Sequence, residues 1–129
     1  MRRWVFRGLL FVVSVGAFLG YVVHDHNEGE RMRRESYAKA QALKDEIDAR
    51  FSKGAPQRDV VSFLQPKLSG DGVWGGFASY SKHDIFVLFV GREPSGVWYC
   101  GPYAVGVQAE FVEERLRETT LTGRADDCL

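Results

Sequence analysis

The chain has 129 residues, with 17 basic and 17 acidic side chains, so it lacks the basic excess of a typical nucleic-acid-binding protein. Nine Phe, five Tyr and three Trp residues give an aromatic content that is too high for a disordered chain. The length suits one small domain with a modest hydrophobic core.

The N-terminal segment Trp4–Val23 is almost entirely apolar, and Arg7 is its single charged residue. At about 1.5 Å per residue, a helix of this length spans roughly 30 Å, the thickness of the hydrocarbon core of a bilayer. We therefore predict a transmembrane signal anchor over 4–23, with Trp4 and Tyr21 at the two membrane interfaces. The alternatives are a cleaved signal peptide, although no A-x-A-like site follows, and a buried core helix, although the segment is apolar on every face.

The charges that flank the apolar segment predict its orientation. Arg2 and Arg3 precede it, whereas no Lys or Arg follows it before Arg31. By the positive-inside rule, 1–27 comprises a cytoplasmic tip, the anchor and a juxtamembrane linker, and 28–129 forms a domain outside the cytoplasm. The predicted location is the inner (plasma) membrane, single-pass, with the domain in the periplasm if the source is a Gram-negative bacterium.

Gly16 and Gly20 form a G-x-x-x-G pair within the same segment. Such a pair permits two helices to approach closely, so one prediction is a homodimer through this face. The alternative is that glycine is simply common in membrane helices.

Residues 28–53 predict an amphipathic helix, because opposite charges four residues apart alternate with an apolar face. The face consists of Ser36, Ala40, Leu43, Ile47 and Phe51. Gly54 suits the end of this helix. The alternative to a separate helix is one that continues from the apolar segment, with Gly29 as its only weak point. A second helix is predicted over 55–65, since Pro56 favours a first helical turn and Pro66 ends it.

From residue 73 the apolar period changes to that of strands, which predicts an antiparallel sheet over 73–122. The continuous apolar run 85–90 indicates a central strand. Residues 109–121 fit either a strand hairpin or a helix. The predicted fold class is α+β: an N-terminal transmembrane helix, then two helices packed on one face of a four- to five-stranded antiparallel sheet.

The aromatic and cysteine residues of the C-terminal half give two further predictions. Cys100 and Cys128 predict one disulfide in a domain outside the cytoplasm, with two free thiols as the alternative. Four aromatic side chains are candidates for a binding face, although packing in the core is the competing role. These four are Trp74, Trp98, Tyr99 and Tyr103.

No motif indicates a catalytic, cofactor-binding or metal site, so none is assigned and no cofactor is expected. His24 and His26 stand two residues apart, a spacing that does not bring both side chains to one ion on a helix. His83 lies in a predicted turn, and Cys100, a conceivable nucleophile, has Cys128 as its expected partner.

The stretch 54–64, which follows the predicted helix 28–53, resembles the helix start of BamE (SmpA/OmlA-like) domains. The matching positions are Gly54, Val60, Leu64, Phe111 and Leu116. The similarity covers about residues 36–122, but Gln65-Pro66 stands where that family usually has Gly-x-Pro, and no lipid-acceptor cysteine is present in the N-terminal segment. The resemblance implies a small extracytoplasmic interaction module.

Together these features predict a membrane-anchored extracytoplasmic protein-interaction or structural module without catalytic activity. Its expected partners are the bilayer, through 4–23, and another envelope protein, but no nucleic acid. The alternative is an inhibitor or immunity-type module that binds and blocks an enzyme.

Overall fold

The computed structural model describes the backbone of residues 2–81, 83–96 and 101–125, and side chains within 11–123 of those ranges. The chain divides into two compact units, Met1–Arg31 and Met32–Leu129. Helix α1 (Arg2–Arg50) begins in the first unit and ends in the second.

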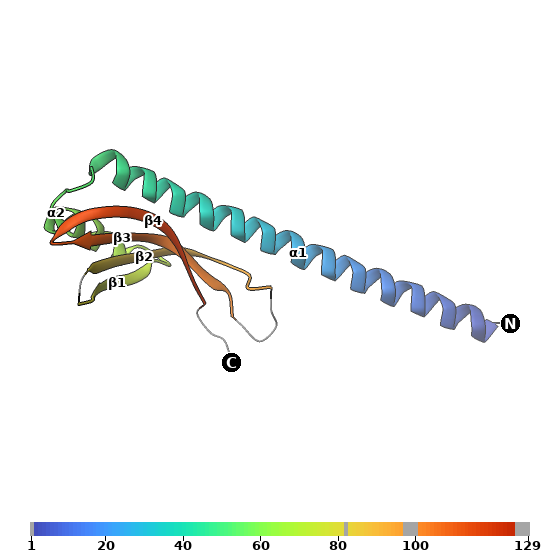
Figure 1. Ribbon diagram of the computed structural model, residues 1–129. Coiled ribbons are helices and arrows are strands. Elements are labelled where there is room, and N and C mark those ends of the chain that lie inside the picture. The colour runs from blue at the N-terminus through green and yellow to red at the C-terminus, as the bar shows by residue number, and fades with distance from the viewer. Residues whose placement is uncertain (1, 82, 97–100, 126–129) are drawn as a thin grey trace. The chain divides into compact units, whose positions relative to one another are not determined.

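The second unit is a small α+β domain (Figure 1). After α1 come α2 (Gln57–Leu64), the 3-10 helix η1 (Gln65–Ser69), β1 (Trp74–Ser79), β2 (Asp84–Glu93), β3 (Tyr103–Val112) and β4 (Arg115–Ala125). The described strands form one antiparallel sheet in the order β1-β2-β3-β4. Strands β1 and β4 are therefore its two edges.

The structure decides the junction between the apolar segment and 28–53 in favour of the alternative of one continuous helix. Helix α1 continues through Gly29 to Arg50. A glycine inside a helix costs only about 1 kcal/mol. Glu28 supports the helix at this point, because its Oε1 atom lies 3.9 Å from His24 Nε2 and 3.7 Å from the Arg31 guanidinium, one turn away on either side.

The described part of the chain contains no helix that is long and apolar enough to cross a membrane. This finding contradicts the predicted signal anchor and, with it, the single-pass inner-membrane location and the periplasmic domain. Within the same helix, the apolar segment is followed directly by the polar run His24-Asp25-His26-Asn27-Glu28. The side chains of Trp4 and Arg7 lie outside the described residues.

The predicted disulfide is also not supported. No disulfide occurs among the described residues, and both Cys100 and Cys128 lie outside them. The backbone ladder holds this end of the sheet, because Tyr103 of β3 pairs directly with Ala125 of β4.

The hydrophobic core lies between one face of the sheet and the helices α1 and α2. Four residues of the predicted apolar face of α1 are confirmed as buried, namely Ser36, Ala40, Leu43 and Ile47, whereas Phe51 follows the end of the helix and is half-buried against the core. The sheet contributes Phe86, Leu88, Val105, Val107, Ala109, Phe111 and Leu116, and α2 contributes Val60 and Leu64. Full burial of one large apolar side chain stabilises the fold by about 1.5–3 kcal/mol.

The structure decides between the two alternatives for 109–121 in favour of a hairpin. Strands β3 and β4 meet at the pair Val112 and Arg115. The two residues between them, Glu113 and Glu114, have φ angles of 51° and 58°. This left-handed pair matches the type I′ turn, whose twist suits a two-residue hairpin.

Candidate protein-binding surface

Strand β1 is an edge strand that exposes aromatic side chains. It pairs only with β2, so the backbone groups on its other side bond to no other described strand. Phe77 keeps 46% of its surface exposed, and Tyr80, just after the strand, keeps 56%. An open strand edge beside exposed aromatic rings combines backbone hydrogen-bonding capacity with the residue types that are enriched at protein interfaces.

The close approach of β1 to β2 depends on Gly75. Its φ of 144° is one that side-chain-bearing residues rarely adopt, and a Cβ atom there would lie 2.0 Å from the carbonyl oxygen of Val87. The glycine therefore lets β1 lie tightly against β2 and holds the aromatic edge in place.

Asp84 stabilises the turn end of the β1–β2 hairpin, where it pairs with Ser79. Its carboxylate accepts hydrogen bonds from Ser79 Oγ at 2.5 Å and from Gln57 Nε2 of α2 at 3.1 Å. These two hydrogen bonds, from Ser79 first and then Gln57, lower the pKa of Asp84. Nearby, the Tyr80 ring stacks on the His83 ring with 5.3 Å between centroids. His83 thus takes part in a turn contact.

Trp74 and Tyr103, the two described residues of the predicted aromatic binding face, lie on opposite faces of the sheet. Trp74 pairs with Phe89, which pairs with Gly106 of β3, whereas Tyr103 lies on the opposite side of β3, three residues earlier. The Trp74 ring packs 5.5 Å from the Phe89 ring, and the Arg92 guanidinium lies 4.9 Å from its centroid. Trp98 and Tyr99 lie outside the described residues.

Residues near the middle of α1 hold the helix against the end of β2. Glu93 accepts a hydrogen bond from Tyr37 Oη at 3.2 Å and forms an ion pair with Arg33 at 3.2 Å. Burial, followed by the negative charge of Glu93 and its hydrogen bond, raises the pKa of Tyr37. These contacts position the helix and leave the edge strand β1 open.

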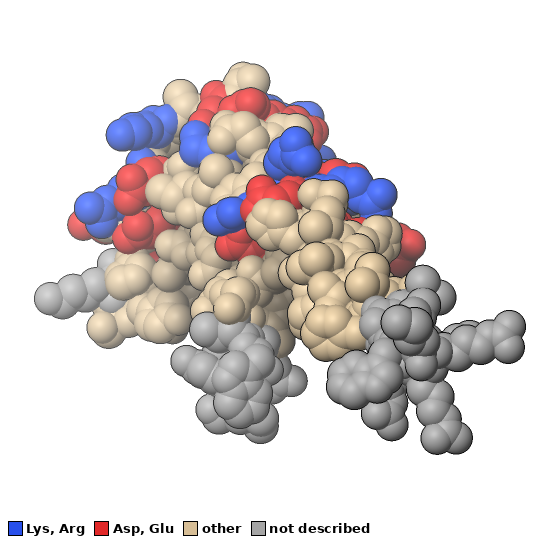
Figure 2. Space-filling model, turned by 90° about the vertical axis from the view of Figure 1, so that its right-hand side faces the viewer, with Lys and Arg blue, Asp and Glu red and all other residues tan. Residues whose placement is uncertain are grey.

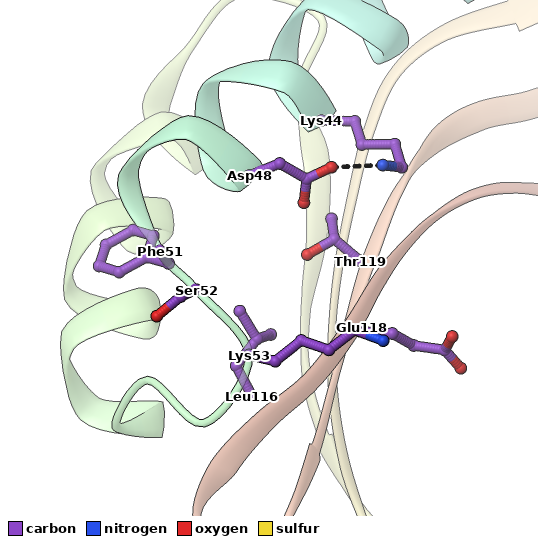
Figure 3. A pocket seen from close by; sticks show the side chains of 8 residues that line it. All are labelled: Lys44, Asp48, Phe51, Ser52, Lys53, Leu116, Glu118 and Thr119. Atoms are coloured by element: carbon purple, nitrogen blue, oxygen red, sulfur yellow. Dashed lines mark hydrogen bonds and ion pairs between the residues drawn. The ribbon is translucent and has the colours of Figure 1, made fainter.

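A second surface feature is a pocket of about 370 Å³ between the end of α1 and β4 (Figure 3). Lys44 and Asp48 form an ion pair at its rim. Its other lining residues are Phe51, Ser52, Lys53, Leu116, Glu118 and Thr119. Thr119 Oγ1 is buried without a hydrogen-bond partner among the described residues. The pocket is open and has a mixed lining, so it presents no built site for a particular small molecule.

In Figure 2, charges of both signs are interleaved over the upper part of the face shown, and the described surface below them is largely uncharged. Ion pairs of the second unit follow the same pattern: Lys44–Asp48, Lys67–Glu46, Arg33–Glu93 and Arg117–Glu110. Such a surface favours recognition by apolar contact and backbone hydrogen bonds over long-range attraction to one sign of charge.

The first unit exposes its apolar side chains. From Phe11 to Val23 the large apolar residues are between 41% and 72% exposed. A Cβ atom at Gly16 or Gly20 would meet nothing within 4 Å, so both positions are open. The homodimer through Gly16 and Gly20 stays a prediction. The described residues contain no group of three or more His, Cys, Asp or Glu side chains arranged for a metal ion.

These features define a small α+β domain whose antiparallel sheet has an open, aromatic edge. A comparison with known proteins found no matching family model, no similar curated protein and no similar solved structure. The resemblance to BamE-like domains therefore stays a prediction.

Sequence reasoning missed Phe77 and Tyr80 as candidate binding residues. A signal was present, because the first strand of a run of consecutive antiparallel strands lies at a sheet edge when each strand pairs with the next. Phe77 falls inside the predicted strand region. Its exposure could not be read from composition, because it depends on how far α1 and α2 extend over the sheet.

Proposed function

We propose that this chain is a non-catalytic protein-interaction module that binds another protein through the edge strand β1. The observation that carries the proposal is the exposure of Phe77 and Tyr80 on and beside an open strand edge. An extended partner segment could add a strand to β1 through backbone hydrogen bonds, while its side chains contact Phe77 on one face and Trp74 on the other.

The hairpin geometry supports this reading. Gly75 and the hydrogen bonds of Asp84 hold β1 in place before any partner arrives. A pre-formed edge reduces the entropy that binding must overcome, because only the partner segment has to become ordered.

Site-specific photo-cross-linking tests the proposal. A photo-cross-linking residue replaces Phe77 in the full chain, which is produced in its host cells, and Asp59, exposed on α2, carries it in the control. We expect position 77 to yield one adduct of defined mass that is absent at position 59. The variant Phe77→Ala should weaken the complex by more than about 1 kcal/mol, roughly fivefold in Kd.

Two outcomes would reject β1 as the binding surface. One is the same adduct pattern at both positions, and the other is an unchanged Kd for Phe77→Ala in a folded protein. If the adduct is an enzyme whose activity falls on binding, the module is of the inhibitor type.

A further inference from the structure

Two cationic side chains surround one aromatic ring where α2 packs beside the end of α1. The centroid of the Phe63 ring lies 4.8 Å from Arg50 Cζ and 4.6 Å from Lys67 Nζ. Phe51 packs edge-on against the same ring at a centroid distance of 5.5 Å. Each cation is attracted by the negative face of the ring. This contact favours one position of the Arg50 side chain at the surface.

The two cations differ in their remaining contacts. Lys67 Nζ forms an ion pair with Glu46 at 3.0 Å, which offsets its charge. Arg50 pairs with no carboxylate among the residues that the structure describes, and its contact there is the Phe63 ring. A guanidinium that lies over a ring keeps its in-plane N–H groups available, and their fork matches the two oxygens of one carboxylate. Arg50 is therefore a pre-positioned binding group for a carboxylate.

A pocket of about 500 Å³ opens beside Arg50. It lies between the end of α1, α2 and the start of η1, and its lining residues are Arg50, Phe51, Asp59, Ser62, Phe63 and Pro66. The rings of the two phenylalanines and the proline give it an apolar wall, and the hydroxyl of Ser62 adds a hydrogen-bond donor. The pocket is open toward solvent. It cannot enclose a free small molecule, but it leaves an exit for a longer chain.

Asp59 adds a negative charge to the pocket that Arg50 lines. Arg58 Nε lies 3.6 Å from Asp59 Oδ1 and offsets this charge only in part, because both side chains are well exposed. The pocket therefore combines a cationic donor with an anionic acceptor. Asp59 would repel a doubly charged phosphate group that was bound to Arg50. A ligand with one carboxylate and one nearby N–H group complements both side chains.

We propose that this pocket binds the C-terminal end of a partner protein whose last residue is apolar. The terminal carboxylate pairs with Arg50 and accepts a hydrogen bond from Ser62 Oγ, and the backbone N–H of the same residue donates to Asp59. The apolar side chain of that residue packs on Phe51 and Pro66. No lining residue of the pocket belongs to β1, so this inference and the proposed function can fail separately. A photo-cross-linked adduct found at position 59 and not at position 77 would come from this pocket.

A matched pair of peptides tests the role of the terminal carboxylate. The full chain is titrated, with detection by NMR, with the peptide acetyl-Gly-Ser-Gly-Phe as its free acid and as its C-terminal amide. We expect the acid to shift the signals of Ser62 and Phe63 and to bind at least about tenfold more tightly than the amide. Free phenylalanine should bind more weakly than the acid, because its ammonium group must lose its hydration beside Arg50. Equal binding of acid and amide, tighter binding of free phenylalanine, or no saturation by the acid at about 10 mM would overturn the proposal.

Substitutions in the pocket test which side chains hold the chain end. Arg50→Gln should raise the Kd of the acid peptide about tenfold and leave that of the amide unchanged, and Arg50→Lys should recover only part of the loss, because lysine lacks the fork. The matched control Arg117→Gln removes an exposed guanidinium from β4 and should change neither Kd. Asp59→Ala should also weaken binding of the acid. An unchanged Kd for Arg50→Gln, or tighter binding by Asp59→Ala, would reject the proposed arrangement.

Discussion

Ser36 Oγ and the backbone of Arg92 exchange two hydrogen bonds, with the hydroxyl accepting from the amide at 3.0 Å and donating to the carbonyl at 2.6 Å. The pairing of β1 with β2 ends at Trp74 and Phe89, so β2 continues beyond its neighbouring strand. The side chain of Ser36 on α1 takes the place of that missing strand. A single buried hydroxyl thereby joins the long helix to the sheet.

Replacing Ser36 with alanine should destabilise the second unit. Ser36→Ala removes both hydrogen bonds to the Arg92 backbone in a site where Ser36 is only 5% exposed. We expect a loss of about 1–3 kcal/mol in the free energy of unfolding, measured by chemical denaturation. The exposed Ser62→Ala on α2 is the matched control and should change the stability by less than about 0.5 kcal/mol. Equal effects of the two changes would contradict this role of Ser36.

Replacing Gly91, which lies beneath Ser36, with any larger residue should destabilise the second unit. A Cβ atom at Gly91 would lie 2.4 Å from Ser36 Oγ and 2.9 Å from the Ser36 Cα atom. The register shift between Phe89 and Gly91 places this glycine under the helix. We expect Gly91→Ala to cost about 1–3 kcal/mol, detected as a lower denaturation midpoint. The control Gly20→Ala meets nothing within 4 Å and should leave the midpoint of the second unit unchanged.

Substitutions in the β3–β4 turn should increase the stability of the domain. Glu113 and Glu114 both have positive φ, a conformation that costs an ordinary residue about 1 kcal/mol and that Asn-Gly adopts readily. The double variant Glu113→Asn/Glu114→Gly should therefore stabilise the domain by about 1 kcal/mol or more, measured as a higher thermal midpoint. A lower midpoint would show that the glutamate side chains contribute more than the turn geometry costs.

Acid should weaken the β1–β2 hairpin through Asp84. Hydrogen bonds from Ser79 and Gln57 hold the pKa of Asp84 below its ordinary value of 3.8 in the folded state. The stabilisation is therefore present above pH 3.8 and is lost as the pH falls through the lowered pKa. We expect thermal midpoints between about pH 2 and 5 to fall less steeply for Asp84→Asn than for the parent. The exposed Asp71→Asn should keep the parent slope, and identical slopes for all three proteins would contradict the assignment.

Phe77 and Phe86 lie directly opposite each other in β1 and β2 but should differ in their contribution to stability. Phe86 is fully buried, whereas Phe77 is 46% exposed. We expect Phe86→Ala to cost about 3–5 kcal/mol and Phe77→Ala about 1 kcal/mol. Denaturant titration of the two variants measures the difference. A cost for Phe77→Ala as large as that for Phe86→Ala would indicate a core role and weaken the argument for a binding edge.

Local patterns in the sequence predicted a large part of the secondary structure of the second unit. The spacing of Ala40, Leu43 and Ile47 indicated the buried face of α1, because helical periodicity is a local property. The continuous apolar run within 85–90 indicated the central strand β2 for the same reason. The sequence left open whether one helix continues through Gly29, and the structure shows that it does, because the cost of one glycine is small beside the helix-forming residues around it.

The sequence by itself determined the buried face of the helix, the strand-forming region 73–122 and the aromatic content of the sheet, since each depends on neighbouring residues. Only the tertiary structure decided that Ser36 bonds to Arg92, that Trp74 and Tyr103 lie on opposite faces, and that Phe77 is left exposed at an edge. These facts depend on strand register and on where the helices end over the sheet. Contacts between residues far apart in the chain set both, and no local pattern encodes them.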